Sequence, residues 1–422
     1  MKHVIIGSGA AGIAAAKTLR SINKTDEIAV ISFDDVLYSR CMLHKYFGNE
    51  RDINHLSFVS DDFFFTHNIT WHKGVCVNGI DTKNKCILMQ NTTLSYDKLL
   101  IATGSDTVIP DVGALRTATN VYGFRHLTDV NLIREKIACA ENILVIGAGL
   151  VGIDVTYALL KLHKAVTVVK LNRATTTTDE INPQIMSLNM DSTAALAYQK
   201  LFEQNGCNFR LDSTITHTLS NEKGAITHVV LETGEKLACD VIIVAAGVRP
   251  SVKFLERSDI ELERGVKVNQ YLETSCENIY AAGSVTALGD IWQSAVRQGE
   301  AAAKNMCGIK TPFTDTFTAK TAVNFFDLST VSVGMINPEN DDTVLTRKDS
   351  NVYQKIILRN NTIAGVIMQG DIAHSGIWQY LIKNKVNLSN LKKSVWDLSF
   401  ADFYDIDETG QYKYKQSNNK TN

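Results

Sequence analysis

The chain has 422 residues, 45% of them hydrophobic and 21% charged, and a formal net charge of −2 at pH 7. This length predicts two or three domains, and the composition is ordinary for a soluble globular protein. The weak net charge gives no electrostatic reason to expect nucleic acid or an anionic membrane as a partner.

Signals for export, membrane insertion or metal binding are weak. Met1, Lys2 and His3 run directly into an apolar strand, which leaves no room for a signal peptide. The strongest apolar run, residues 241–248, is too short to span a bilayer. The eight cysteines form no CxxC pair, which favours a reduced protein over a disulfide framework or a zinc site. We therefore expect a cytoplasmic protein that holds no metal.

The first predicted element is a strand that enters a glycine-rich turn and a helix. Residues 2–20 read KHVIIGSGAAGIAAAKTLR, so that Gly7, Gly9 and Gly12 form a GxGxxG pattern. The first glycine makes the tight turn, the second admits a pyrophosphate, and the third lets helix and strand pack closely. A turn without a ligand is the alternative, but the strand–turn–helix context favours a dinucleotide site at the helix N-terminus.

The same unit recurs in the middle of the chain. Residues 143–163 read ILVIGAGLVGIDVTYALLKLH, with Gly147, Gly149 and Gly152 at the same spacing. About a hundred residues after each loop comes a hairpin-like segment and a strand that ends in small residues. These segments are 86–105 and 226–250. A duplicated dinucleotide-binding fold explains the repeat.

A third glycine signal, IYAAGSVTALGD at residues 279–290, follows another strand and precedes a helix-like segment. It is expected to return the chain to the first domain. From about Pro312 onward, strand-like runs alternate around an Asn360-Asn361 turn, which predicts a smaller α+β domain.

The predicted fold class is therefore α/β, with two Rossmann-like dinucleotide-binding domains of the three-layer ββα type and a C-terminal α+β domain. The expected boundaries place residues 1–115 and 239–311 in the first domain, 116–238 in the second, and 312–422 in the third.

These motifs together resemble the flavoproteins of the pyridine-nucleotide oxidoreductase family. The resemblance rests on both GxGxxG loops and on residues 98–105, 244–250 and 279–285. Further segments are similar to rubredoxin reductases and to the flavin portion of the nitrite reductase large subunit: 38–45, 292–306 and 324–334. The sirohaem and iron–sulfur cysteines of the latter have no counterpart, so the resemblance is to a stand-alone reductase.

The resemblance implies FAD in the first domain, NADPH or NADH in the second, and hydride transfer from nicotinamide to flavin. Rubredoxin, another small redox protein, oxygen or a disulfide would then take the electrons. It also implies a homodimer formed through the C-terminal domain.

The resemblance also assigns residues to the two cofactors. FAD would contact Gly7, Gly9, Ala10, Ala11, Gly12, Asp34, Arg40, Val77, Ala102, Thr103, Gly104, Gly283 and Ser284. NAD(P)H would contact Gly147, Gly149, Leu150, Val151, Gly152, Lys170, Arg173 and Gly247.

A lysine near the flavin is implied by the pattern Tyr-x-Arg-x-x-Leu-x-Lys, which ends at Lys45. In related reductases this lysine pairs with an acid on the second nucleotide helix, usually glutamate, and Asp154 stands there in this chain. The pair would place a fixed positive charge beside the reduced flavin and stabilise its anionic form. An ordinary surface lysine is the alternative.

Two departures from the family pattern predict weaker FAD binding. Ser284 replaces an aspartate that bonds the ribityl hydroxyls, and a hydroxyl makes no charge-assisted bond. The acid expected about 20 positions past the first loop is shifted by one, so that Phe33 precedes Asp34. These changes motivate a rival hypothesis, a flavin-free, non-catalytic nucleotide-binding sensor or assembly protein.

A third departure concerns the choice of nicotinamide cofactor. Lys170 stands where relatives that prefer NADH carry glutamate, and Arg173 follows shortly after it. A lysine attracts a 2′-phosphate that a carboxylate would repel, so NADPH is favoured. A solvated lysine with no role in selection is the alternative.

Cys41 leaves two readings open. It matches the position of the redox cysteine in relatives that reduce disulfides or oxygen, and Arg40, His44 and Lys45 could lower its pKa. No second cysteine lies within a few residues, so a small structural residue beside the flavin remains the other reading.

Overall fold

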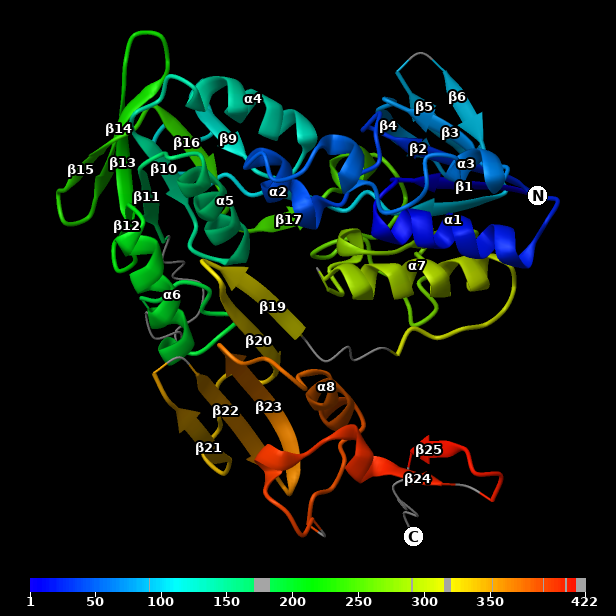
Figure 1. Ribbon diagram of the computed structural model, residues 1–422. Coiled ribbons are helices and arrows are strands. Elements are labelled where there is room, and N and C mark those ends of the chain that lie inside the picture. Colours follow the sequence, from blue (N-terminus) through cyan, green and yellow to red (C-terminus); the bar gives the residue numbers. More distant parts are fainter. Residues whose placement is uncertain are drawn as a thin grey trace. The chain divides into compact units, whose positions relative to one another are not determined.

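The computed structural model describes residues 1–90, 92–170, 183–289, 291–314, 320–350, 352–389, 391–406 and 408–414 (Figure 1). Contacts within the chain divide it into two compact units. Unit 1 comprises Met1–Arg173 and Asn208–Asp315, and unit 2 comprises Ala174–Cys207 and Thr316–Asn422. No helix among these described residues is long and apolar enough to cross a membrane.

The first module of unit 1 is built on a five-stranded parallel sheet in the order β18-β7-β1-β2-β3. Its strands are β1 (Lys2–Ile6), β2 (Glu27–Ser32), β3 (Thr70–Lys73), β7 (Lys98–Ile101) and β18 (Ile279–Ala281). One layer beside it is a three-stranded antiparallel sheet of β4 (Val77–Asp81), β5 (Cys86–Met89) and β6 (Thr93–Ser95). The other layer holds α1 (Ala10–Ile22) and α7 (Trp292–Met306), and the short α3 (Phe63–Thr66) follows β2.

The alternation of strand side chains explains the three layers. Ile5 of β1 joins the cluster around α1 and α7, whereas Val4 and Ile6 join the cluster around β4 and β5. Successive residues of a strand face opposite sides of its sheet, so an entirely apolar strand must be covered twice. The three-layer arrangement expected from the sequence is confirmed.

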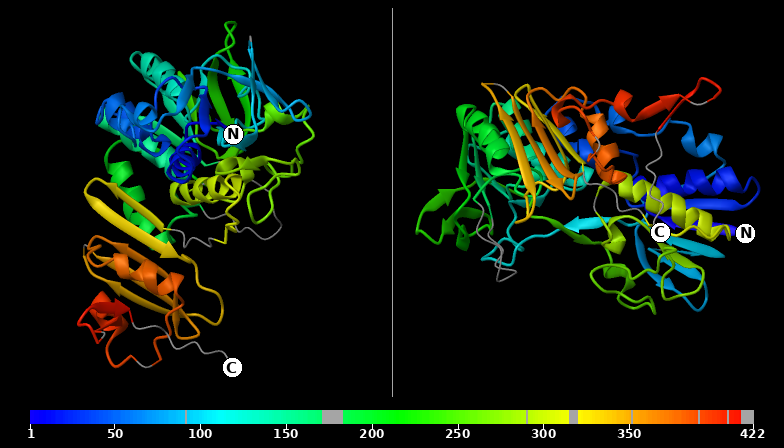
Figure 2. Two further views of the ribbon diagram at one scale, coloured as in Figure 1. Left: turned by 90° about the vertical axis from the view of Figure 1, so that its right-hand side faces the viewer. Right: turned by 90° about the horizontal axis from the view of Figure 1, so that it is seen from below.

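The alanine-rich sequences of α1 and α7 let the two helices approach closely. A Cβ added at Gly299 would overlap the backbone of Ala11 across this contact. Figures 1 and 2 both show α1 and α7 side by side. Strand β18 has already rejoined the first sheet, and this close packing adds α7 to the same module, as the third glycine motif predicts.

The second module of unit 1 repeats the plan. Its sheet has the order β12-β11-β10-β16-β9, in which β9, β10, β11 and β16 run parallel. The strands are β9 (Val121–Gly123), β10 (Ile143–Ile146), β11 (Val166–Val169), β12 (Cys207–Arg210) and β16 (Val241–Val244). The module is completed by an antiparallel sheet and two helices. The sheet consists of β13 (Ile215–Ser220), β14 (Ile226–Leu231) and β15 (Lys236–Ala238), and the helices are α4 (Leu127–Ile137) and α5 (Leu150–Lys161).

The expected boundary at residue 239 is wrong. Strand β16 pairs with β10 in the register Ile143↔Val241, so the segment belongs to the second module. The chain crosses back only afterwards, where β17 (Val248–Pro250) pairs antiparallel with β8 (Ser105–Thr107). A buried apolar strand does not reveal from its sequence which of two similar sheets it will join.

Unit 2 carries a five-stranded antiparallel sheet in the order β19-β20-β23-β22-β21. Its strands are β19 (Lys320–Phe325), β20 (Leu328–Gly334), β21 (Thr343–Lys348), β22 (Tyr353–Arg359) and β23 (Thr362–Gln369). Helix α8 (Gly376–Lys383) packs on this sheet, and β24 (Tyr404–Ile406) and β25 (Tyr412–Tyr414) form a terminal hairpin. Asn360 and Asn361 have φ of 48° and 58° in the hairpin turn between β22 and β23. The predicted α+β domain and its Asn-Asn turn are confirmed.

Helix α6 (Ser192–Gln204) belongs to unit 2, which corrects the expectation that residues 116–238 form one domain. The Tyr198 hydroxyl donates to the Leu328 carbonyl oxygen at 2.6 Å. Asp191, just before the helix, accepts hydrogen bonds from the Lys355 ammonium at 3.0 Å and the Tyr353 hydroxyl at 2.6 Å. These buried long-range bonds tie α6 to the C-terminal sheet.

Candidate cofactor sites

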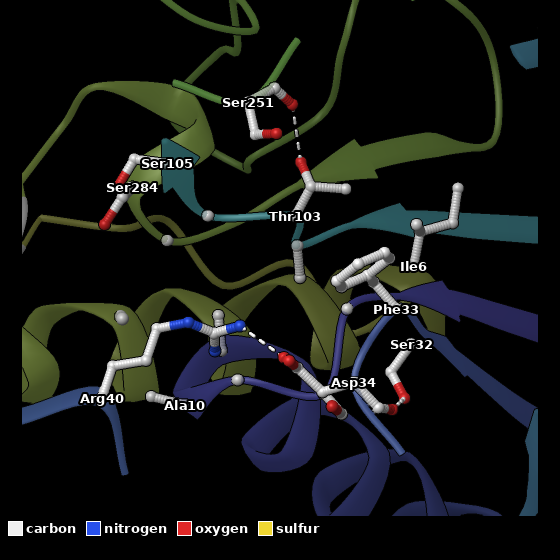
Figure 3. A pocket seen from close by; sticks show the side chains of 18 of the residues that line it. Ile6, Ala10, Ser32, Phe33, Asp34, Arg40, Thr103, Ser105, Ser251 and Ser284 are labelled. Carbon is white, nitrogen blue, oxygen red and sulfur yellow. Dashed lines mark hydrogen bonds and ion pairs between the residues drawn. The ribbon is translucent and has the colours of Figure 1, made fainter. Parts of the chain in front are cut away.

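A cavity of about 490 Å³ lies beside the first glycine turn, within the usual range for ligand sites (Figure 3). Most of the residues predicted to contact FAD line it. They are Gly7, Gly9, Ala10, Ala11, Asp34, Arg40, Val77, Ala102, Thr103, Gly104, Gly283 and Ser284, and Cys41 lines it as well. Gly12 is buried beneath the turn.

The three glycines of the first turn have different neighbours. A Cβ at Gly7 would overlap the Ala102 carbonyl, and one at Gly12 would overlap the Gly7 carbonyl. At Gly9, by contrast, the nearest atom to an added Cβ is Nη1 of Arg40, 3.7 Å away. Gly7 and Gly12 therefore serve the packing of the turn, and Gly9 leaves open space before the N-terminus of α1. This is the cradle that a phosphate group needs.

The second turn reproduces this arrangement. A Cβ at Gly147 would overlap the Ala245 carbonyl, and one at Gly152 would overlap the Gly147 carbonyl. Gly149, the N-cap of α5, has no heavy atom of the described chain within 4 Å of an added Cβ. The next two residues, Leu150 and Val151, form the first turn of α5, and Val151 is exposed. Both turns thus leave their second glycine open to a ligand.

The Arg40 guanidinium is held beside the first cradle. Its Nη2 lies 2.7 Å from Oδ2 of Asp34, and Figure 3 shows the two side chains turned toward each other. The Tyr38 hydroxyl donates to Oδ1 of the same carboxylate at 3.0 Å and accepts from the backbone N–H of Leu127 at 3.1 Å. Arg40 can therefore meet a phosphate that is seated at Gly9.

A side chain of helix α7 holds the third glycine motif in place. The buried Gln298 side chain accepts a hydrogen bond from the Gly283 N–H at 2.8 Å, and Ser284 then begins a short turn on the cavity wall. On another part of the wall, the Thr103 hydroxyl donates to the Ser251 carbonyl at 2.9 Å, as Figure 3 shows. Ser284 is thus placed to offer one neutral hydrogen bond where relatives offer a charged one.

Lys45 and Asp154 do not form the expected pair. Within the described residues, the ion-pair partner of Lys45 is Glu50, at 2.9 Å, on the segment after α2 (Leu43–Phe47). Asp154 on α5 instead lies 3.7 Å from Nδ1 of His44. Burial raises the pKa of Asp154 to about 7 against the opposing effect of Lys45, and burial lowers the pKa of His44 to about 4. Near pH 7 His44 is therefore neutral and Asp154 is about half ionised, so the two do not form a full ion pair.

The structure does not activate Cys41. It lies on the turn Arg40–Met42 and keeps some solvent-exposed surface, yet burial of the thiol raises its pKa, and the Asp154 charge acts in the same direction. Only Arg125 opposes these effects appreciably by its charge. A low-pKa thiolate is not favoured at this position.

Lys170, predicted to select the nicotinamide cofactor, directly follows β11, and Gly247, predicted to contact that cofactor, lies after β16. Burial lowers the pKa of Lys170, and its backbone N–H donates to the Arg210 carbonyl at 3.0 Å. Arg173 lies outside the described residues. Gly247 has φ of +109°, and among the described residues no heavy atom lies within 4 Å of a Cβ added to it, so it leaves space there as Gly149 does.

The main residues that sequence reasoning missed are Arg125 and His126. They line the cavity from the segment between β9 and α4, where Arg125 donates from Nη2 to the Ser105 hydroxyl at 2.7 Å. These adjacent basic residues after a short strand were the available signal. Phe33 and Trp292 also line the cavity, and Phe33 is 58% exposed. The cavity therefore combines an open phosphate cradle, cationic side chains and aromatic surface, which fits a dinucleotide with a planar ring.

Comparisons with known proteins agree with this geometry. The family described as Pyridine nucleotide-disulphide oxidoreductase matches residues 1–299, and the Rubredoxin NAD+ reductase C-terminal domain matches residues 320–386. Proteins of the first family use FAD and NAD(P)H.

Individual relatives are distant but cover most of the chain. The assimilatory nitrate reductase electron transfer subunit of Bacillus subtilis is 29% identical over 87% of this chain, which spans 47%, about half, of that protein. The rubredoxin-NAD(+) reductase of Pseudomonas putida is 27% identical over 74% of this chain and 81% of its own length. The solved NADH:rubredoxin oxidoreductase of Clostridium acetobutylicum matches with a TM-score of 0.72 at 22% identity, covering 93% of this chain and 97% of that one. This last likeness confirms the fold.

Proposed function

Because the chain belongs to the pyridine nucleotide-disulphide oxidoreductase family, we propose that it oxidises NADPH or NADH and passes electrons to rubredoxin or another small redox protein. The match to the rubredoxin reductase C-terminal domain and the similarity to the Pseudomonas putida reductase support this acceptor. The chemistry that bound FAD would supply is acceptance of a hydride and release of its electrons to such an acceptor.

The observation that carries the proposal is the pair of open glycines, Gly9 and Gly149, within one compact unit. Each lies at the N-terminus of a helix, where backbone N–H groups and the helix dipole favour a phosphate. The chain thus offers one cradle for each of the two dinucleotides that the reaction needs.

Other side chains of the site would orient FAD and keep water away from it. Arg40 faces the phosphate position, Ser284 offers a hydroxyl from the third glycine motif, and Arg125 contributes a second positive charge at the wall. Phe33 and Trp292 supply apolar surface. Lys45 lies near Asp154 and is paired with Glu50, and it is not among the described residues that line the cavity.

Two other acceptors and one other function are less well supported. A disulfide acceptor needs an activated thiol, and burial raises the pKa of Cys41. Oxygen needs no docking surface on the protein. Reoxidation by oxygen is therefore the reaction with which reoxidation by rubredoxin is compared. The flavin-free sensor or assembly protein is not favoured, because the cavity keeps its open cradle and its arginine.

We also propose a cytoplasmic location and a homodimer. The location rests on the scattered cysteines, which favour a reduced protein, and the homodimer rests on the family resemblance alone. Light scattering of the purified protein tests the dimer, and a monomer at micromolar concentration would contradict it.

The deciding experiment is anaerobic reduction of the purified chain. We expect a yellow protein that takes up about one FAD per chain, is bleached by NADPH or NADH, and regains its colour when oxidised rubredoxin is added. A colourless protein that takes up no added FAD would refute the oxidoreductase. Bleaching without reoxidation by rubredoxin, ferredoxin or flavodoxin-type proteins would refute only the acceptor.

A further inference from the structure

We propose that Asp34 is a positioning residue for Arg40, so that this chain recognises its dinucleotide through the diphosphate and not through a carboxylate on the ribose hydroxyls. The inference rests on the proposed binding of FAD at the first cradle. It assigns Asp34 a different role from the ribose contact that its place in the sequence predicts.

The first observation is that both oxygens of Asp34 already have partners. Oδ2 accepts from Arg40 at 2.7 Å, and Oδ1 accepts from Tyr38 at 3.0 Å. The Asp34 side chain is only 9% exposed, and the Tyr38 residue is only 3% exposed. Most of the surface of this carboxylate is covered, and breaking the bond to Tyr38 in order to reach a ribose would leave the buried Tyr38 hydroxyl without its acceptor.

The second observation is that the backbone around Asp34 is fixed. The Ser32 hydroxyl donates to the Asp34 carbonyl oxygen at 2.7 Å, and the Trp71 indole N–H donates to the Ser32 hydroxyl at 2.8 Å. The residue that directly follows β2 is Phe33, which is 58% exposed and lines the cavity. An aromatic ring therefore stands where a ribose-binding acid was expected, and the fixed backbone does not shift Asp34 into that place.

The third observation is where Arg40 points. Its Nη1 is the nearest heavy atom, at 3.7 Å, to a Cβ built on Gly9. The same guanidinium therefore faces Asp34 with one nitrogen and the open phosphate cradle with the other. A guanidinium can bind a carboxylate and a phosphate on different edges, because its five donors lie in a fixed plane.

These contacts form a continuous path from the cradle to the second module. It runs from Gly9 to Arg40, Asp34 and Tyr38, and ends at the first N–H of α4, on Leu127. Arg40 has many rotamers, and fixing it before the ligand arrives removes that entropic cost from binding. Asp34 and Tyr38 are expected to act on FAD affinity only through Arg40.

A double-mutant cycle on FAD affinity tests this, with FAD fluorescence quenching on the flavin-depleted full chain as the readout. Asp34→Asn should raise the FAD Kd about tenfold in the native background and less than about twofold in an Arg40→Gln background. Equal effects in both backgrounds, or tighter binding by Asp34→Asn, would overturn the inference. Asp35→Asn is the matched control, because it removes an equal charge from an exposed neighbour, and it should leave the FAD Kd unchanged.

A second measurement separates ribose from phosphate recognition. ADP and 2′,3′-dideoxy-ADP should compete with FAD equally, within about threefold, in the native protein and in Asp34→Asn. A tenfold preference for ADP that disappears in Asp34→Asn would assign Asp34 to the ribose and overturn the proposal. If the native chain binds neither FAD nor ADP, the proposed function fails as well, and circular dichroism of each variant shows whether the fold is intact.

Discussion

Substitution of Gly149 by alanine should separate cofactor binding from folding. Gly149 is the N-cap of α5 with φ of −77°, an ordinary backbone conformation for alanine, and its added methyl group meets no described heavy atom within 4 Å. The expected loss of folding stability is therefore small, about 0.5 kcal/mol, since alanine is a poorer N-cap than glycine.

The cost to NAD(P)H binding should be much larger. The methyl group would occupy the space through which a pyrophosphate approaches the N–H groups at the start of α5. Lengthening one or two charge-assisted hydrogen bonds is worth about 1.5–3 kcal/mol, which corresponds to a 10- to 150-fold higher KM for NAD(P)H. The FAD content should not change, because Gly9 and its cradle are untouched.

Gly152→Ala is the matched control in the same turn. Its methyl group would overlap the Gly147 carbonyl, so the strand and helix must move apart at a cost of about 1–3 kcal/mol or more. The assay combines thermal melting, FAD absorbance and steady-state NADPH and NADH oxidation with ferricyanide. An unchanged KM in Gly149→Ala, or a loss of melting temperature as large as that of Gly152→Ala, would refute the assignment of the open glycine to the nucleotide.

Four further outcomes are expected. Dithionite should deliver two electrons per flavin to the native protein and to Cys41→Ser alike, since burial raises the thiol pKa, and an uptake of four by the native protein would contradict this. Lys170→Glu should shift the ratio of kcat/KM for NADPH over NADH at least about tenfold toward NADH, and a native enzyme that already prefers NADH would contradict the role of Lys170. Lys45→Met should slow flavin reduction by NAD(P)H in stopped-flow experiments. An unchanged rate would show that Lys45 is an ordinary surface residue. Burial raises the pKa of Asp154 to about 7, so between pH 4 and 7 the folded protein binds more protons than the unfolded chain and loses stability as the pH rises. Asp154→Asn should therefore stabilise the protein by about 2–4 kcal/mol at pH 8 but hardly at pH 4. Equal shifts of the melting temperature at both pH values would contradict this.

The features that could be predicted from the sequence are those with a local physical cause. Gly7 and Gly12 were assigned to the turn and to packing, and Gly9 to the ligand, because a GxGxxG unit imposes these roles by backbone geometry alone. The distances around the three glycines agree with each role. The Asn360-Asn361 turn likewise follows from the tolerance of asparagine for positive φ.

The features that could not be predicted depend on choices among distant partners. Lys45 was expected to pair with Asp154, yet Glu50 lies closer along the chain and reaches it at 2.9 Å. An aspartate is one methylene shorter than the glutamate that relatives carry, which leaves Asp154 beside His44. Such competition is decided by a few ångströms of side-chain reach, and a sequence pattern records only the residue types.

The first cradle has a cation beside it that is fixed before any ligand arrives. Nη1 of Arg40, whose guanidinium is held by Asp34, is the nearest heavy atom, at 3.7 Å, to a Cβ built on Gly9. A prearranged cation lowers the cost of binding and slows release. The first cradle is therefore suited to a dinucleotide that stays bound through many turnovers, which is what a resident flavin requires.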